Sequence, residues 1–289
     1  MENEILALGS FSRLVKSRYS CRSFDGKGLR QDEINLLGRF CREVNTPFPA
    51  PLRLEIIHEH GRQGRKMFGA GTYGLIRGAR CFIAGIVDPR NPDCWANLGY
   101  GMQAVVLRAT AMDLQTCWIG GVFDRRAFRR LLEITPGENV PAVVAVGRAA
   151  ARRTLRDRLV RKAARGDSRK APGELFFYRE PGMPLPPLLA ERFGSVLEFV
   201  RLAPSASNKQ PWRFFVEENS LHLYLNRDRF YSRLIPSVDL QKIDLGIAML
   251  HLSLAAREAS LEGEWRSLSS GLPAIAADFE YLATYCLFD

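Results

Sequence analysis

Two arginines flank a serine near the start of the sequence, in the run Arg18-Tyr19-Ser20-Cys21-Arg22. A guanidinium group can form paired, charged hydrogen bonds to a phosphate, and a serine hydroxyl adds a neutral donor. Arg18, Ser20 and Arg22 could therefore bind a phosphate group together. The same run could instead be the basic end of a helix, where positive charge complements the helix dipole. The residues alone favour neither interpretation.

A second candidate is the segment 204–212, with the sequence PSASNKQPW. Its serines and Asn208 offer several hydrogen-bond donors and acceptors within a few residues, and its two prolines stiffen the chain. Such a loop suits a planar ligand with polar edges. A simple turn from a helix to a strand, with Asn208 at an unusual backbone angle, would explain the same residues.

A third candidate is the segment 116–123, with the sequence TCWIGGVF. We interpret it as a strand that ends in Gly120 and Gly121, where the backbone could approach a ligand closely. A tight turn is the alternative. The segment 69–74 also matches the dinucleotide pattern GxGxxG, but a strand follows it instead of preceding it, so we predict a loop there.

Composition narrows the possible classes of protein. The 289 residues carry a net charge of +10, which indicates either a basic proteome or a phosphate-bearing ligand. Because no nucleic-acid-binding module is recognisable, we expect no nucleic-acid partner. The six cysteines form no CxxC pair and the four histidines are scattered, so we predict no metal site and no disulfide framework. Without a signal peptide or an apolar run of about 20 residues, we expect a cytoplasmic protein without a membrane span.

Periodicity predicts mixed helices and strands. Apolar spacing predicts helices over residues 4–16, from Asp32, over 93–112, after Asp124, over 189–201 and over 239–259. Strands are predicted over residues 52–58, 81–87, 140–146, 212–217, 221–225 and 281–288, and residues 218–220 join two of them in a hairpin.

The two long predicted helices resemble each other. A shift of 147 residues pairs Leu98 with Leu245, Gly99 with Gly246, Met102 with Met249, Leu107 with Leu254, Ala109 with Ala256, Leu114 with Leu261 and Trp118 with Trp265. Shared leucine and alanine are common in amphipathic helices, but Met and Trp in the same register favour an internal duplication. We therefore divide the chain into an amino-terminal half at 1–165, a Gly- and Pro-rich linker at 166–187 and a carboxy-terminal half at 188–289.

Taken together, the three candidate segments resemble the nitroreductase superfamily. The first segment is similar to that family's Arg-x-Ser-x-Arg phosphate motif, and PSASNKQPW matches its Pro-Ser-x-x-Asn-x-Gln-Pro-Trp motif at every defined position. The order of elements fits over most of the chain. The resemblance is greatest to a subgroup in which one chain holds both halves of the usual homodimer. It implies an α+β, nitroreductase-like fold made of two pseudo-symmetric halves, and such a fused chain could be a monomer.

The resemblance also implies an FMN cofactor in a cleft between the halves, with NAD(P)H as electron donor. It places these residues at the flavin: Arg18, Tyr19, Ser20, Arg22, Ile119, Gly120, Gly121, Arg152, Arg153, Pro204, Ser205, Ser207, Asn208 and Gln210. Arg18, Ser20, Arg22 and one of Arg152 or Arg153 would lie near the phosphate, and the glycines near the ring.

The sequence departs from the family pattern in three places. Tyr19 stands where a second basic residue is common. The first half has residues 45–49, NTPFP, where the second has the Pro-Ser loop, and the second half has no Arg-x-Ser-x-Arg motif. Each half therefore keeps one set of contacts and lacks the other, which predicts one FMN per chain.

The function that follows from the resemblance is reduction of a nitroaromatic, a quinone or a related small acceptor by FMN and NAD(P)H in a ping-pong hydride transfer. The flavin carries this chemistry, and no catalytic side chain stands out in the sequence. The alternative is a flavin- or nucleotide-binding sensor without enzymatic activity on the same fold.

Overall fold

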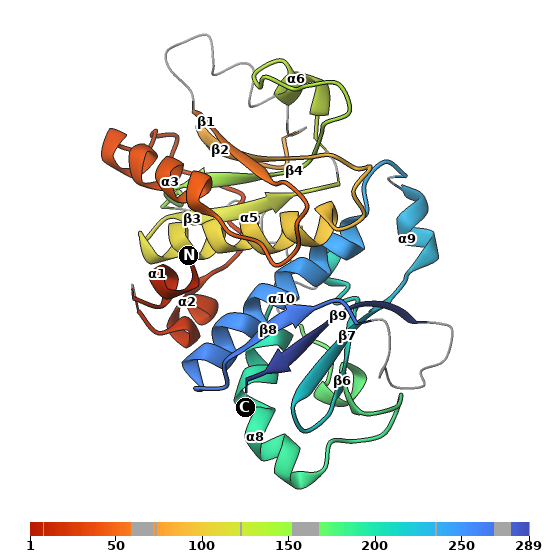
Figure 1. The fold of residues 1–289 in the computed structure, drawn as a ribbon. Helices are drawn as coiled ribbons and strands as arrows, with labels where there is room; N and C mark the ends of the chain where they lie inside the picture. Colours follow the sequence, from red (N-terminus) through yellow and green to blue (C-terminus); the bar gives the residue numbers. More distant parts are fainter. Residues whose placement is uncertain are drawn as a thin grey trace.

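Two long helices, α5 (Cys94–Ala111) and α10 (Leu240–Glu258), form the centre of the molecule, with a β-sheet on either side (Figure 1). The computed structural model describes residues 1–7, 9–58, 72, 74–121, 123–151, 168–234, 236–268 and 279–288. The predicted helices over 93–112 and 239–259 are confirmed to within one residue at each end. Nearly all of their residues are buried, so both helices belong to the core.

The first half is a helix–strand–strand–helix–strand–strand unit. Its elements are α3 (Gln31–Glu43), β1 (Arg53–His58), β2 (Cys81–Val87), α5, β3 (Gln115–Ile119) and β4 (Asn139–Gly147). The strands form a sheet in the order β1-β2-β4-β3, and all neighbours are antiparallel. A short helix, α6 (Arg125–Arg129), follows Asp124 as predicted and lies between β3 and β4, and the Asp124 side chain caps it.

The second half repeats this plan. Its elements are α8 (Pro187–Arg201), β6 (Trp212–Val216), β7 (Ser220–Asn226), α10, β8 (Gly263–Arg266) and β9 (Phe279–Leu287), with a short helix α9 (Arg229–Leu234) before α10. The strands are ordered β6-β7-β9-β8 and are again antiparallel, and β6 and β7 form the predicted hairpin. The predicted α+β fold of two pseudo-symmetric halves is therefore confirmed.

The beginning of the chain differs from the prediction. The single helix predicted over residues 4–16 is wrong: two helices, α1 (Glu2–Leu6) and α2 (Phe11–Ser17), stand in its place. Gly9 lies between them with a φ of +144°, a conformation that ends a helix and that L side chains rarely adopt.

The start of α3 also differs from the prediction. The helix begins at Gln31, so Asp32 lies inside its first turn and does not cap it. Glu33 closes this end instead, because its carboxylate accepts a hydrogen bond of 2.8 Å from the backbone N–H of Arg30.

Part of the predicted linker belongs to a sheet. Residues 176–178 form strand β5 (Phe176–Tyr178), which pairs in parallel with β6 at the edge of the second sheet. A short 3-10 helix, η1 (Pro172–Glu174), precedes it. The chain that follows β4 of the first half is therefore attached to the sheet of the second half.

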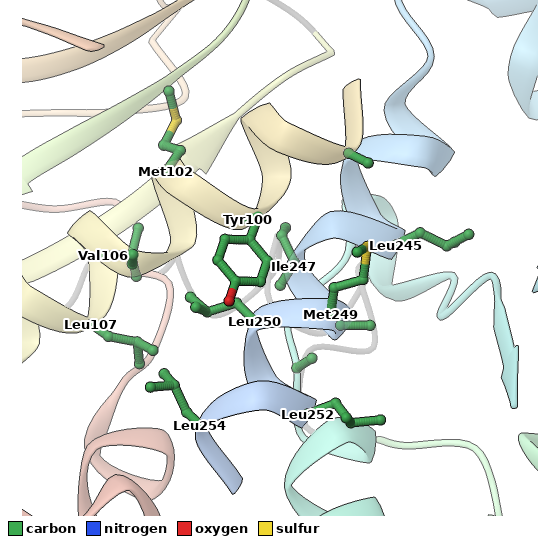
Figure 2. Packing of buried hydrophobic residues seen from close by; sticks show 14 of the residues in the cluster. Tyr100, Met102, Val106, Leu107, Leu245, Ile247, Met249, Leu250, Leu252 and Leu254 are labelled. Carbon is green, nitrogen blue, oxygen red and sulfur yellow. The ribbon is translucent and has the colours of Figure 1, made fainter. Parts of the chain in front are cut away.

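The two central helices approach each other at a pair of glycines. A Cβ atom on Gly99 would lie 2.0 Å from the carbonyl oxygen of Ile243, and one on Gly246 would lie 2.0 Å from the carbonyl oxygen of Ala96. These contacts exchange under the 147-residue shift, since Ala96 corresponds to Ile243, so the helices cross about a local pseudo-two-fold axis. Apolar side chains of both helices surround the crossing (Figure 2).

Substitution of Gly246 by alanine tests this crossing. The added methyl group would meet backbone atoms of α5, so we expect Gly246→Ala to lower the free energy of unfolding by about 1–3 kcal/mol or more, measured by urea denaturation. Gly194→Ala is the matched control, because Gly194 lies inside α8 and a Cβ there would meet nothing within 4 Å. The control should be neutral or stabilising, since alanine is the better helix former. Equal effects of the two substitutions would contradict this description of the crossing.

Candidate functional site

The segment after α2 is extended and joins the end of the first sheet. The N–H of Cys21 donates to the carbonyl of Thr116 on β3 at 2.8 Å, and the N–H of Arg77 donates to the carbonyl of Arg22 at 2.9 Å. In an extended segment alternate side chains share a face. Cys21 and Ser23 are buried, so the residues that alternate with them, at positions 18, 20 and 22, lie on the opposite face.

That opposite face carries the predicted phosphate motif. Arg18 and Arg22 are half-buried and Ser20 is exposed, and the three side chains follow one another at every second position. Within the described chain, the side chains of Ser20 and Arg22 make no hydrogen bond or ion pair. The structure therefore presents the hydroxyl and two guanidinium groups on one face, and Tyr19 packs on the other side among apolar residues of the first sheet.

The glycines after β3 lie where the two halves meet. A Cβ atom on Gly120 would lie 2.7 Å from a methyl group of Leu240, the first residue of α10. The carbonyl of Gly120 accepts a hydrogen bond of 2.7 Å from Arg125. Ile119 is buried, and Gly121 lies in the bend that follows. The close approach that Gly120 permits in this structure is between the first half and α10.

The predicted Pro-Ser loop has a strained backbone. Ser207, Asn208 and Gln210 have φ values of +50°, +54° and +48°, in the left-handed region that residues other than glycine seldom adopt. Such conformations persist only where the surroundings hold them, and they concentrate at functional sites. Here the Ser205 hydroxyl accepts from the N–H of Gln210 at 3.0 Å, and Asp244 on α10 accepts from the N–H of Ala206 at 2.9 Å.

The amide side chains of the loop bind the segment Ser168–Lys170. Asn208 donates to the carbonyl of Ser168 at 2.8 Å and accepts from Arg169 at 3.2 Å, and the Gln210 side chain accepts from the N–H of Lys170 at 3.0 Å. Arg169 is thereby fixed beside the loop. The sequence analysis missed this arginine because it lies in the segment that we treated as a linker, although the Arg-Lys pair was a visible signal.

Arg18 and Arg169 both affect the pKa of one buried histidine. Burial lowers the pKa of His251 on α10 to about 3, although the carbonyl of Phe199 opposes this effect, and the positive charges of Arg18 and Arg169 lower the pKa further. Arg18 belongs to the phosphate motif, and Arg169 is bound to the Pro-Ser loop. The two motifs, about 190 residues apart in the sequence, therefore lie in one neighbourhood at the junction of the halves.

Some predicted residues lie outside the described part of the chain. Arg152 and Arg153 are among them, and so are Gly69 and Gly71 of the GxGxxG pattern. The predicted role of the two arginines stays a prediction. Among the residues that the structure does describe, no group of three or more His, Cys, Asp or Glu could hold a metal ion, and no helix is long and apolar enough to cross a membrane.

Comparison with known families identifies the fold. The family described as "Putative TM nitroreductase" matches residues 11–256, which is most of the chain. The protein belongs to this nitroreductase family. A search of curated protein sequences finds no significant match.

Solved structures agree with this nitroreductase fold. A putative nitroreductase from Thermotoga maritima superposes with a TM-score of 0.58 at 19% identity, covering 96% of this chain and 93% of its own. A nitroreductase family protein from Clostridium novyi NT covers 50% of this chain and 87% of its own, with a TM-score of 0.42 and 15% identity. An FMN-dependent nitroreductase from Clostridium difficile R20291 covers 50% of this chain and 92% of its own, with a TM-score of 0.39 and 14% identity. The predicted nitroreductase-like fold is confirmed by the full-length match.

A buried chain of hydrogen bonds in this nitroreductase-family protein connects β3 to the second half. The indole N–H of Trp118 donates to the side-chain oxygen of Gln103 at 3.0 Å. The Gln103 amide nitrogen lies 3.0 Å from His251 Nε2, and His251 Nδ1 lies 2.9 Å from the carbonyl of Phe199. A carbonyl only accepts, so Nδ1 carries the proton and Nε2 accepts from Gln103. The chain is fully satisfied with a neutral imidazole.

The two halves also form a second cleft, at the position that pseudo-symmetry relates to the candidate site. It has a volume of about 360 Å³ and is lined by residues 45–47 of the first half and by Gly263–Trp265 on β8 of the second. Glu2 lines it as well, paired with Arg257 at 3.4 Å and hydrogen-bonded to Tyr100. The described residues lining this cleft include no counterpart of the Arg-x-Ser-x-Arg motif.

The neutrality of His251 predicts a pH dependence of stability. Its pKa is lowered in the folded chain, so between pH 6.5 and about 3 the histidine is protonated in the unfolded chain and neutral in the native chain. The free energy of unfolding should therefore fall as the pH drops from about 6.5 towards 3, by up to ~1.4 kcal/mol per pH unit.

His251→Asn serves as the comparison, because asparagine does not titrate. Urea denaturation curves recorded between pH 3 and 7 give the free energy of unfolding at each pH. We expect this free energy to depend less steeply on pH in the variant, by the contribution of one proton, while His222 titrates in both proteins. Parallel pH profiles for the two proteins would show that His251 does not titrate in this way.

Proposed function

We propose that this nitroreductase family member is an FMN-dependent oxidoreductase that takes electrons from NAD(P)H and reduces a nitroaromatic, a quinone or a related small acceptor. The observation that supports this most directly is the Arg-x-Ser-x-Arg segment. It presents two guanidinium groups and a hydroxyl on one face, and Arg18 of this segment shares the neighbourhood of His251 with Arg169, which is bound to the strained loop.

The donor set fits the phosphate end of FMN. Ser20 and Arg22 make no side-chain hydrogen bond within the described chain, so their donors are available to a ligand. A phosphate dianion accepts several hydrogen bonds at once, and charge-assisted bonds from arginine are the stronger kind. Arg18, Ser20 and Arg22 would hold the phosphate, and Arg152 or Arg153 would add a further charge.

The second half would contribute the Pro-Ser loop and its neighbour. Pro204, Ser205 and Ser207 lie on the loop, and its strained backbone orients their polar groups. In this structure the side chains of Asn208 and Gln210 are occupied in fixing Ser168–Lys170. Asn208 would therefore act on the cofactor mainly through Arg169, whose charge lies beside the loop.

Bound FMN would supply hydride transfer, and the protein would bind and orient it. We assign no catalytic side chain. Next to the loop is a surface hollow of about 830 Å³, whose cations include Arg169, Lys170 and Lys209. Burial lowers the pKa of Lys170, and the nearby charges of Arg213 and Lys209 add to this effect while Glu174 opposes it. An anionic nicotinamide donor would be attracted to these cations.

The proposal includes the location and the assembly of the protein. All six cysteines are free thiols, which suits the reducing cytoplasm. The pairing of α5 with α10 inside one chain replaces the contact that a homodimer would need, so the protein could act as a monomer without a nucleic-acid or membrane partner.

The rival function is a flavin or nucleotide sensor without enzymatic activity, since the same fold could hold the cofactor without turning it over. Steady oxidation of NAD(P)H by the FMN-loaded protein, with an added nitroaromatic or quinone, supports the enzyme. Flavin binding without such turnover supports the sensor.

Arg22→Ala tests the phosphate site. Loss of one charge-assisted hydrogen bond costs about 1.5–3 kcal/mol, so the dissociation constant for FMN should rise roughly 10- to 150-fold. Arg13→Ala is the matched control, because Arg13 is an exposed arginine on α2 and its loss should leave the constant unchanged. Fluorescence titration of FMN into each folded variant gives the constants. An unchanged constant for Arg22→Ala would remove Arg22 from the site.

A further inference from the structure

One carboxyl group beneath the Pro-Ser loop has an incomplete set of hydrogen bonds. Asp244 lies on α10 with only 3% of its surface exposed. Its Oδ1 accepts the hydrogen bond from Ala206 in the loop. Its Oδ2 is buried and has no hydrogen-bond partner within the described residues. A buried ionised oxygen without a partner is costly, so the protonation of this group matters.

The first half carries a counterpart in Asn97. The 147-residue shift pairs Asn97 with Asp244, and Asn97 is also fully buried. Its side chain accepts from the N–H of Phe48 at 3.2 Å and donates to the carbonyls of Phe48 and Ala50 at 2.8 and 2.7 Å. Each long helix therefore uses one buried polar residue to hold the loop that enters the first strand of its own half.

The two counterparts differ in charge. An asparagine amide is neutral at every pH, whereas an aspartate must be protonated to be neutral. Burial raises the pKa of Asp244 well above its usual value. The hydrogen bond from the Ala206 N–H opposes this effect, and the like charge of Asp239, the N-cap of α10, adds to it.

The charged groups around Asp244 offer it little compensation. The charge of Asp244 raises the pKa of Tyr231 on α9, after the larger effect of burial. Lys209 of the loop lies over the Tyr231 ring, but its ammonium group is paired with Asp228 at 3.0 Å. The neighbouring contacts with α5 and β3, at Gly246 and Leu240, are uncharged.

We infer that Asp244 is a positioning residue, which holds the Pro204–Gln210 loop in its strained conformation through Ala206 and does so as a neutral carboxyl group. Ionisation would leave a buried negative charge with one oxygen unpaired. Release of the loop would expose this charge to water, so ionisation favours the released loop over the held one. A group with a raised pKa in the folded state favours that state at low pH, so the held loop is lost as the pH rises through the pKa of Asp244.

Amide hydrogen exchange at Ala206 tests this inference. Exchange rates are divided by the intrinsic rate at each pH, which gives the protection of the N–H that donates to Asp244. In the wild-type protein we expect protection to fall with rising pH, by up to tenfold per unit between about pH 4, where an exposed aspartate ionises, and the raised pKa of Asp244 in the held loop. In Asp244→Asn, which keeps the shape and cannot ionise, protection should stay constant.

A second variant separates protonation from shape. Asp239→Asn removes the like charge and keeps a good helix cap, so it should lower the pKa of Asp244 in the held loop. The loss of protection should then end at a lower pH and be smaller in total. Constant protection in the wild-type protein, or the same pH profile in Asp244→Asn, would overturn the inference. The measurement needs no flavin, so a chain that failed to bind FMN would contradict the proposed function and leave this result standing.

Discussion

The close crossing of α5 and α10 is the constraint on which the rest of the structure depends. Gly99 and Gly246 let each helix touch the backbone of the other, and a side chain at either position would force them apart. Each helix carries the sheet of its own half, so this distance sets the separation of the two sheets. The contact is mostly apolar and buried, with the Gln103–His251 hydrogen bond inside it, so it stabilises the pair as a homodimer interface would.

The two halves share a backbone plan but have diverged in their polar residues. Trp118 and Trp265 occupy equivalent strands, and each donates its indole N–H to the long helix of its own half, to Gln103 and to Ser253. Around the first tryptophan lie an arginine-rich segment and a neutral histidine. Around the second lie Glu2 and its ion pair with Arg257. One junction is therefore suited to an anion, and the other is lined by a carboxylate of the chain itself.

The sequence predicted the parts whose signal is local and periodic. The long helices, the hairpin and the buried strands follow from runs of apolar residues, which burial in a core requires. The strand β8 was not predicted, because its four residues alternate in exposure without an apolar run. The helix break at Gly9 depends on one backbone angle. The roles of Arg169 and Gln103 depend on contacts between distant segments, which no local pattern contains. Asp244 could have been identified from the sequence, since the 147-residue shift already pairs it with Asn97.

The central claim is that one complete cofactor site forms, from the arginine segment of the first half and the loop of the second. Titration of the purified chain with FMN at concentrations far above the dissociation constant tests it most directly, because the break point gives the number of sites. The account predicts one FMN per chain, since the second cleft contains Glu2 and its described lining lacks the Arg-x-Ser-x-Arg motif. A break point at two would show that the second cleft also binds the cofactor. A titration without binding would show that the fold persists without its flavin.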